Sequence, residues 1–204
     1  MKKFLVILVM VTLLGGFVFA QDTNTDTQKI TVTMNEIALL AVTGAAASTG
    51  STTADAPAVA ISVTQPELAG AAPVVTVVQD PTYLRYTSLR FGGLERKVTT
   101  TFSTLPAGFS ISLAAGTTDS SAKGNVGTGA TLEFVGTTLT GDLVTSIGAG
   151  LARTGIESNA GHPLTYTAMI DETALANLGD GLADGGFLNA VDTVITVTFT
   201  LTDI

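Results

Sequence analysis

The 204-residue sequence contains no cysteine, no tryptophan and a single histidine. Without a thiol, the chain cannot form a disulfide bond, a thiolate metal site or a cysteine nucleophile. A lipoprotein anchor is excluded as well, because no cysteine follows the N-terminal apolar run to be acylated. A chain of this length can bury a sufficient core without disulfides. The absence of tryptophan argues against a carbohydrate-processing enzyme, because the sites of such enzymes depend heavily on aromatic stacking against the sugar.

Positive charge is also scarce, with 9 basic residues against 17 acidic ones and a net charge of −8. This balance argues against a nucleic-acid partner, since a phosphate backbone requires a basic surface. It argues equally against binding to an anionic membrane. Charged residues make up 13% of the chain and hydrophobic residues 46%. Such an apolar composition is not that of a disordered chain.

The N-terminus has the three parts of a secretory signal. Lys2 and Lys3 precede an apolar run from Phe4 to Leu14, and Val18 and Ala20 supply small or β-branched residues before Gln21. The run is shorter than the roughly 20 residues of a membrane span. We therefore predict a signal peptide over residues 1–20 and a single mature domain over residues 21–204, with no membrane span after cleavage. An uncleaved anchor is the alternative. The predicted location is extracellular or at the cell surface, or else in the periplasm.

The mature sequence is dominated by β-branched and small residues, which favour strands. Alternation of apolar and polar residues predicts half-buried strands at 30–34, 59–63, 109–113, 164–168 and 191–201. More continuously apolar runs predict strands at 37–42, 74–78, 84–91, 98–102, 132–135 and 143–147. Long loops are expected at 44–56, 116–129 and 148–162, and one short helix at Asp171–Leu178. The fold class is all-β, an antiparallel immunoglobulin-like β-sandwich of nine to eleven strands with at most one short helix.

Candidate chemistry is sparse along this sequence. His162, between Gly161 and Pro163, would be a general base or ligand on a functional interpretation and a loop residue before a strand on a structural one. We favour the structural interpretation, because no serine elbow or second ligand stands near it. Oxygen ligands for Ca²⁺ occur in a Gly-rich stretch at Asn177, Asp180 and Asp184, and more weakly at Asp119 with Asn125. The spacing in the Gly-rich stretch matches neither the EF-hand loop nor the Gly-Asp nonapeptide repeat. We expect no catalytic, cofactor or metal residue, and therefore no enzyme.

Most of the mature chain's positive charge gathers within 13 residues, at Arg85, Arg90, Arg96 and Lys97, among Tyr83, Tyr86 and Phe91. Two interpretations stay open. The group could bind an anion or a glycan, or it could form the solvated face of a hairpin with edge charges that block unwanted strand pairing. The second is the expectation from the sequence.

The segment Gly186–Phe199 begins with a glycine and an aromatic residue, Gly186 and Phe187, and continues as an alternating strand rich in Asp, Thr and Val. It resembles the final strand of spore-coat-U-type and chaperone–usher pilin subunits, and the general layout of signal, alternating N-terminal segment and Thr/Gly/Ala-rich body is similar. The chain departs from that pattern in having no disulfide and in running on to Ile204. The resemblance implies an immunoglobulin-like sandwich with a structural or adhesive role, in which an alternating strand from a neighbour can complete the sheet.

Two functions from different classes follow as expectations. The first is a secreted or cell-surface structural or adhesive protein, a fimbria-like subunit that self-associates or binds other surface proteins. The alternative is a monomeric extracellular module that binds a glycan or a surface protein. The alternating segment Lys29–Met34 either pairs within its own domain or adds to the sheet edge of a neighbour. Pairing within the domain is the simpler expectation, because the apolar face needs a partner as soon as the chain is secreted.

Overall fold

The computed structural model describes residues 28–45, 56–172 and 194–204. The chain divides into two units, residues 1–34 and residues 35–204. The predicted signal peptide and the predicted calcium ligands Asn177, Asp180 and Asp184 lie outside the described residues, as does most of the predicted helix at 171–178. Within the described ranges, no helix has the length and hydropathy required to cross a membrane.

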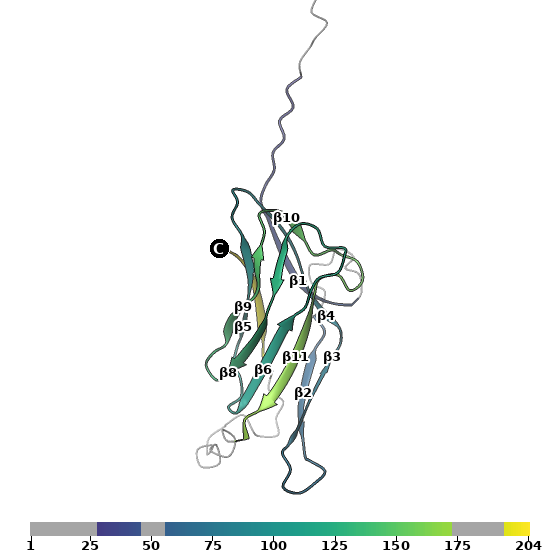
Figure 1. Ribbon diagram of the computed structural model, residues 1–204, viewed down its shortest axis with the longest axis vertical. Helices are drawn as coiled ribbons and strands as arrows, with labels where there is room; N and C mark the ends of the chain where they lie inside the picture. The colour runs from purple at the N-terminus through teal and green to yellow at the C-terminus, as the bar shows by residue number, and fades with distance from the viewer. Residues whose placement is uncertain (1–27, 46–55, 173–193) are drawn as a thin grey trace, which may run out of the picture. The chain divides into compact units, whose positions relative to one another are not determined.

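The second unit is built from strands, as the β-branched composition predicts (Figure 1). Twelve strands lie in the described residues, against the nine to eleven that were expected. They are β1 (Ile37–Gly44), β2 (Val59–Thr64), β3 (Val74–Gln79), β4 (Thr82–Arg90), β5 (Arg96–Phe102), β6 (Phe109–Ala115), β7 (Val126–Gly129), β8 (Thr131–Val135), β9 (Thr140–Ile147), β10 (Gly150–Arg153), β11 (His162–Ile170) and β12 (Val197–Asp203). The predictions of loops at 116–129 and 148–162 were wrong where β7 and β10 form.

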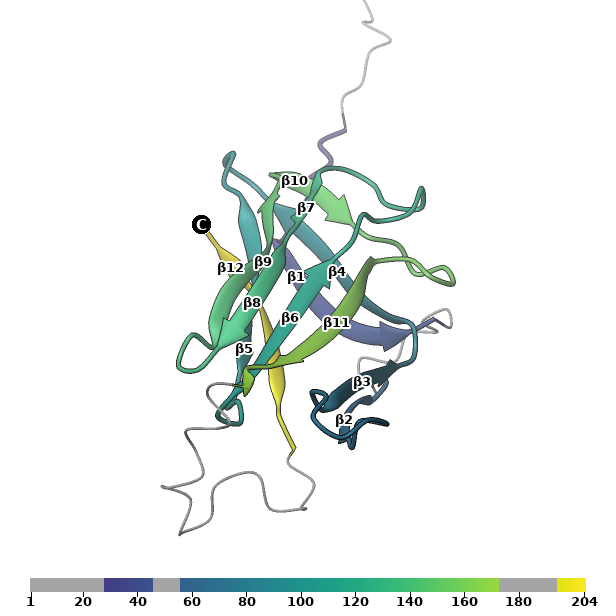
Figure 2. The same cartoon turned by 60° about the horizontal axis from the view of Figure 1, so that its bottom comes forward.

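The strands pair antiparallel in three sheets (Figure 2). The largest has the order β1-β4-β11-β6-β8, with β10 pairing the end of β4 and β11 pairing its beginning. The second sheet has the order β12-β5-β9-β7, and β2 and β3 form a separate hairpin. Antiparallel sheets with one face buried give the alternation of apolar and polar residues seen in the sequence. The all-β, antiparallel sandwich is therefore confirmed.

One hydrophobic core joins the two larger sheets. Leu84 and Leu113 from the first sheet and Val98 and Leu143 from the second are fully buried in the same cluster. Across the middle of the sandwich, the rings of Phe102 and Phe134 lie 4.3 Å apart between centroids at an angle of 40°. Because β5 and β8 belong to different sheets, this aromatic pair ties the two layers together.

One side of the sandwich is closed where the chain passes from the second sheet to the first between two consecutive strands. β7 pairs with β9 in the second sheet, and after Ala130 the chain continues as β8, which pairs with β6 in the first. The amide of Ala130 donates to Leu143 O at 2.8 Å, and its carbonyl accepts from Ala115 N at 2.9 Å. At Gly129 a Cβ would lie 2.2 Å from Ala115 O, so the crossing requires glycine. The opposite side, where β1 and β12 end their sheets, has no such crossing strand among the described residues.

One side chain at the end of β3 hydrogen-bonds the β2–β3 hairpin to the first sheet. Gln79, the last residue of β3, accepts from Tyr166 N at 2.8 Å and donates to Leu164 O at 3.1 Å. The amide group thus satisfies the backbone of β11 just beyond the point where its pairing with β4 ends at Leu164. A glutamine amide offers one acceptor and two donors, which suits it to replace a strand partner.

The first unit contributes the described residues 28–34, and these form no strand. The predicted strand at 30–34 was therefore wrong for this structure, although its alternation of residues is plain. Ile30, Val32 and Met34 are 76%, 77% and 60% exposed. Period-two alternation indicates which side chains would share one face of a strand, but it does not supply the partner strand that is needed for pairing.

Candidate functional site

The open side of the sandwich holds an apolar cavity of about 330 Å³. The β12 end contributes the apolar residues Ile195, Val197 and Phe199, and the first sheet contributes Thr82 of β4 and Tyr166 of β11. Its remaining lining residues are Val42 of β1 and residues 56–59 at the start of β2. The Thr82 hydroxyl already donates to Asp80 O at 2.8 Å. Burial raises the pKa of Tyr166 to about 12, so its phenol remains neutral.

Incomplete covering of β12 gives rise to this cavity. The inward residues Val197, Phe199 and Leu201 are only partly buried, although each packs against the core. In the described part of the chain, β12 pairs with β5 alone and β1 pairs with β4 alone. Both strands therefore present one row of backbone groups that no neighbouring strand satisfies. Such an edge can accept another strand.

A charged cluster joins the two edge strands at their other end. Arg96 of β5 donates from Nε to Asp203 of β12 at 2.8 Å and from Nη1 to Ser88 Oγ of β4 at 3.2 Å. The same guanidinium bonds the carbonyl oxygen of Ile37 at the start of β1, and Nη2 lies 3.6 Å from Glu36 Oε2. Arg96 thereby connects the beginning of β1 to the end of β12.

Arg90, the last residue of β4, also pairs with Asp203. The side chains of Arg90 and Arg96 are 11% and 7% exposed, whereas that of Asp203 is 56% exposed. The prediction that these arginines form a solvated hairpin face was wrong. They point into the sandwich because each has the parity of the buried residues on its strand. Asp203 of β12 pairs with both of them, and Glu36 lies close to Arg96.

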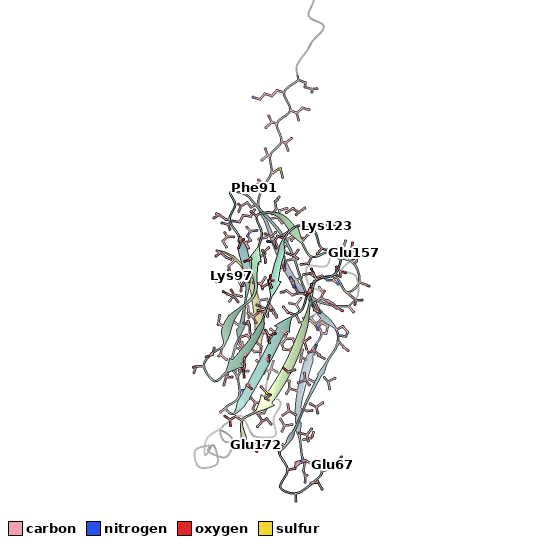
Figure 3. All side chains as sticks on the ribbon, viewed as in Figure 1. Glu67, Phe91, Lys97, Lys123, Glu157 and Glu172 are labelled. Carbon is pink, nitrogen blue, oxygen red and sulfur yellow. The ribbon has the colours of Figure 1, made fainter. Side chains whose placement is uncertain are left out.

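Arg85 was also expected on the solvated face, and it too is buried. Its Nε donates to Ala160 O at 2.8 Å and Nη2 donates to Glu157 O at 3.2 Å. The guanidinium thus holds the segment between β10 and β11 against β4. Since Arg85 is occupied by backbone carbonyl groups, the four basic residues do not form the single anion-binding surface that the sequence left open. Lys97, with Asp142 at 2.9 Å, lies apart from them on the outer face (Figure 3).

His162 is the first residue of β11 and is 1% exposed, not a loop residue. Gly161 before it has φ 113°, and a Cβ there would lie 2.7 Å from Leu84 O, so glycine permits this entry into the strand. The ring of His162 stacks on that of Tyr86 at 5.7 Å between centroids, with 2.9 Å from Nε2 to the Tyr86 hydroxyl. Nδ1 lies 2.8 Å from Gly116 O.

Carbonyl oxygens face both ring nitrogens of His162. Gly116 O lies 2.8 Å from Nδ1 and Val126 O lies 3.3 Å from Nε2, and the Tyr86 hydroxyl donates to Val126 O. Burial raises the pKa of Tyr86, which keeps the phenol protonated as a donor. Burial lowers the pKa of His162 and outweighs the opposing effect of the two backbone carbonyl groups. The lining of the cavity described above does not include Tyr86 or His162, and the geometry of the pair is that of a buried structural network.

Comparison with protein-family models, curated proteins and solved structures finds no significant match.

Asp119 and Asn125 each close a local turn. Asp119 Oδ1 accepts from Ser121 N at 3.0 Å, and Asn125 Oδ1 accepts from Gly127 N at 3.0 Å. Their side-chain oxygens therefore serve the backbone on separate turns. Among the described residues, no group of three acidic or histidine side chains could hold a metal ion.

The sequence reasoning missed the Arg90–Arg96–Asp203 cluster and the cavity. A signal for the cluster was present, because Arg96 alternates in phase with Val98 and Phe102, which are buried. The cavity had no such signal, since it is bounded by five elements that are far apart in the sequence.

We expect Asp203→Asn to lower the free energy of unfolding by about 1–2 kcal/mol. The substitution leaves two mostly buried guanidinium groups without their shared carboxylate. A hydrogen bond to a charged group contributes roughly 1.5–3 kcal/mol, and the expected loss is smaller because Asp203 is partly exposed to water. Urea unfolding at low and high salt would measure the loss.

Asp142→Asn is the matched control, because it removes the same charge from another strand of the same sheet. The hydrogen bond from Lys97, followed by that from Thr99, lowers the pKa of Asp142. The Lys97 side chain is 32% exposed, whereas those of Arg90 and Arg96 are 11% and 7% exposed. Exposed pairs contribute roughly 0–1 kcal/mol. Equal losses for the two variants would contradict a special role for the Asp203 cluster.

Proposed function

We propose that this chain is a secreted or cell-surface structural protein, a fimbria-like subunit of immunoglobulin-like architecture that self-associates and has no catalytic activity. The observation that carries the proposal is the exposed, alternating segment 28–34 in a chain whose sandwich has an open side. Ile30, Val32 and Met34 expose their side chains, while β1 and β12 end their sheets in the described structure.

Physical chemistry makes this combination unfavourable for an isolated chain. Burying each of these three large apolar side chains would stabilise the protein by roughly 1.5–3 kcal/mol, and this stabilisation is absent while they are exposed to water. Covering the partly buried face of β12 and filling the cavity of about 330 Å³ would add further stabilisation. An alternating strand from a second copy could bury its apolar face at this side and satisfy an unpaired edge with its backbone.

The resulting contact would be heterologous, because a segment of one copy meets a different surface of the next. Contacts of this type form rings where the rotation closes and open filaments where it does not. A structural role follows from such assembly, and the strongly acidic surface would keep unassembled copies soluble.

The test compares the mature chain from Gln21 with a chain that begins at Asn35. We expect the mature chain to form multimers and the shortened chain to remain monomeric, with melting temperatures within a few degrees of each other. Starting at Asn35 retains Glu36, whose carboxylate faces Arg96, so the charged cluster is not disturbed. Sizing by light scattering, negative-stain imaging and thermal melts provide the readouts.

A chain that begins at Gln28 is the matched control. It removes the polar stretch 21–27 and keeps the alternating segment, and we expect it to assemble as the mature chain does. A mature chain that stays monomeric at all concentrations would overturn the proposal, as would multimers formed by the chain from Asn35.

A monomeric binding module is the second candidate, and the cavity favours it. Its volume lies at the lower end of the range for ligand pockets, roughly 300–1,000 Å³, and its lining is mostly apolar. A monomeric mature chain that is stabilised by a small apolar ligand, and loses this stabilisation in a Val197→Trp variant, would favour the module over the subunit.

A further inference from the structure

The cavity on the open side of the sandwich has an unpaired hydroxyl group in its lining. Tyr166 lines the cavity and is 9% exposed. Its amide donates to Gln79 Oε1, but its hydroxyl forms no hydrogen bond within the described part of the chain. The hydroxyl oxygen is not itself enclosed by protein atoms and therefore borders open space. A hydroxyl group in this position can hydrogen-bond to a molecule that fills the cavity.

The rest of the lining is apolar or already engaged. Thr82 donates from its hydroxyl to Asp80 O at 2.8 Å, so its side chain has no further proton to donate to a ligand. The other eight lining residues are alanine, proline, valine, isoleucine or phenylalanine. The lining therefore combines an apolar wall with one unpaired side-chain donor, which is the usual composition of a small-molecule site.

The electrostatics of the lining select an uncharged molecule. A carboxylate would leave water for a site with one hydroxyl donor and no basic side chain, which does not compensate for its lost hydration. The net charge of −8 also repels anions at longer range. Since burial raises the pKa of Tyr166 to about 12, its phenol keeps the proton that it can donate.

The volume of the cavity sets the size of the molecule. An apolar cavity of about 150 Å³ can hold benzene, so the cavity of about 330 Å³ can hold roughly a dozen non-hydrogen atoms. We propose that it binds a neutral, mainly apolar small molecule of this size with a carbonyl, ether or hydroxyl oxygen, which accepts a hydrogen bond from Tyr166.

This site goes beyond the proposed self-association and does not depend on it. A strand from a second copy would approach the same open side, so its side chains and the small molecule would compete for the cavity. The test therefore uses the full mature chain with Val32→Asp. Val32 is 77% exposed, and a charge there opposes insertion of the segment into a neighbour while it leaves the sandwich unchanged. Binding is then measured without interference from assembly.

Two neutral probes of nearly the same size separate the hydrogen bond from apolar burial. Propiophenone carries a carbonyl oxygen where sec-butylbenzene carries a methyl group. We expect both to bind with dissociation constants below about 1 mM by ligand-observed NMR or calorimetry. Adding Tyr166→Phe keeps the ring and removes the hydroxyl. It should weaken propiophenone about fivefold, as expected for the loss of one hydrogen bond, and change sec-butylbenzene less than twofold.

Two controls test the charge selection and the location. The anion 3-phenylpropionate should bind at least tenfold more weakly than propiophenone, and Val197→Trp, which fills the cavity, should abolish binding of both neutral probes. Where Val197→Trp does not fold, displacement of sec-butylbenzene by propiophenone shows that the probes share one site. The proposal is overturned if neither neutral probe binds, if Tyr166→Phe weakens the two probes equally, or if the anion binds as tightly as the ketone.

Discussion

Phe102→Ala is expected to lower the free energy of unfolding by about 3–5 kcal/mol, which is the usual cost of removing a buried phenylalanine. Phe102 is 2% exposed and contacts Phe134 across the two sheets. The substitution therefore opens a void at the contact between the layers, where neither sheet can close it without moving as a whole. For a domain of this size each kcal/mol corresponds to roughly 2–4 °C in melting temperature.

Phe91→Ala is the matched control, since it removes the same ring from a position that is 43% exposed. Its cost should stay below about 1 kcal/mol. Urea unfolding of both variants, with Phe134→Ala and the double variant, would also give the coupling between the two rings, expected at about 0.5–1.5 kcal/mol. A Phe102 variant as stable as the Phe91 variant would show that the sandwich is not held together at this contact.

Alternation in the sequence predicted four of the twelve described strands because it records which face of a sheet is buried, and more continuous apolar runs predicted six others. β2, β6 and β11 lie where alternating segments were identified, and β12 begins six residues after the start of its segment. The same parity identifies Arg90, Arg96 and His162 as inward residues. For Arg90 and Arg96 the solvated-face prediction failed because it ranked charge above parity. Arg85 has the opposite parity on β4 and is buried by its contacts with the segment between β10 and β11.

β7 and β10 had no comparable signal. Each has four residues, Val-Gly-Thr-Gly and Gly-Leu-Ala-Arg, with glycines that weaken strand propensity. They form strands because they pair with β9 and β4, and this pairing depends on the tertiary structure and not on the local sequence. A sequence-local analysis cannot detect pairing of this kind.

The surroundings of His162 illustrate the same limit at a single side chain. His162 contacts Tyr86, Gly116 and Val126, which are 76, 46 and 36 positions away in the sequence. Its neighbours Gly161 and Pro163 indicated a strand entry, and this part of the prediction was close to the structure. Nothing in those neighbours revealed that the ring would turn inward to meet a tyrosine and a loop.

In the proposed assembly, the effect of a charged substitution in segment 28–34 depends on which face of the strand carries it. Val32→Asp should weaken assembly at least 100-fold, because it removes a burial worth about 1.5–3 kcal/mol and places a carboxylate in an apolar site. A 100-fold change corresponds to about 2.7 kcal/mol. Concentration-dependent sizing of the mature chain would measure it.

Thr33→Asp adds the same charge one residue further along and is the matched control. Successive side chains of a strand point to opposite faces, so residue 33 would face water when residue 32 faces the neighbour. Its effect on assembly should stay within about tenfold. Equal effects of the two substitutions would indicate that general charge repulsion, rather than strand addition, governs the association. Because Val32 is 77% exposed, the melting temperature of the monomer should not change in either variant. A marked fall for Val32→Asp alone would show that the segment pairs within its own chain and would remove the basis for exchange.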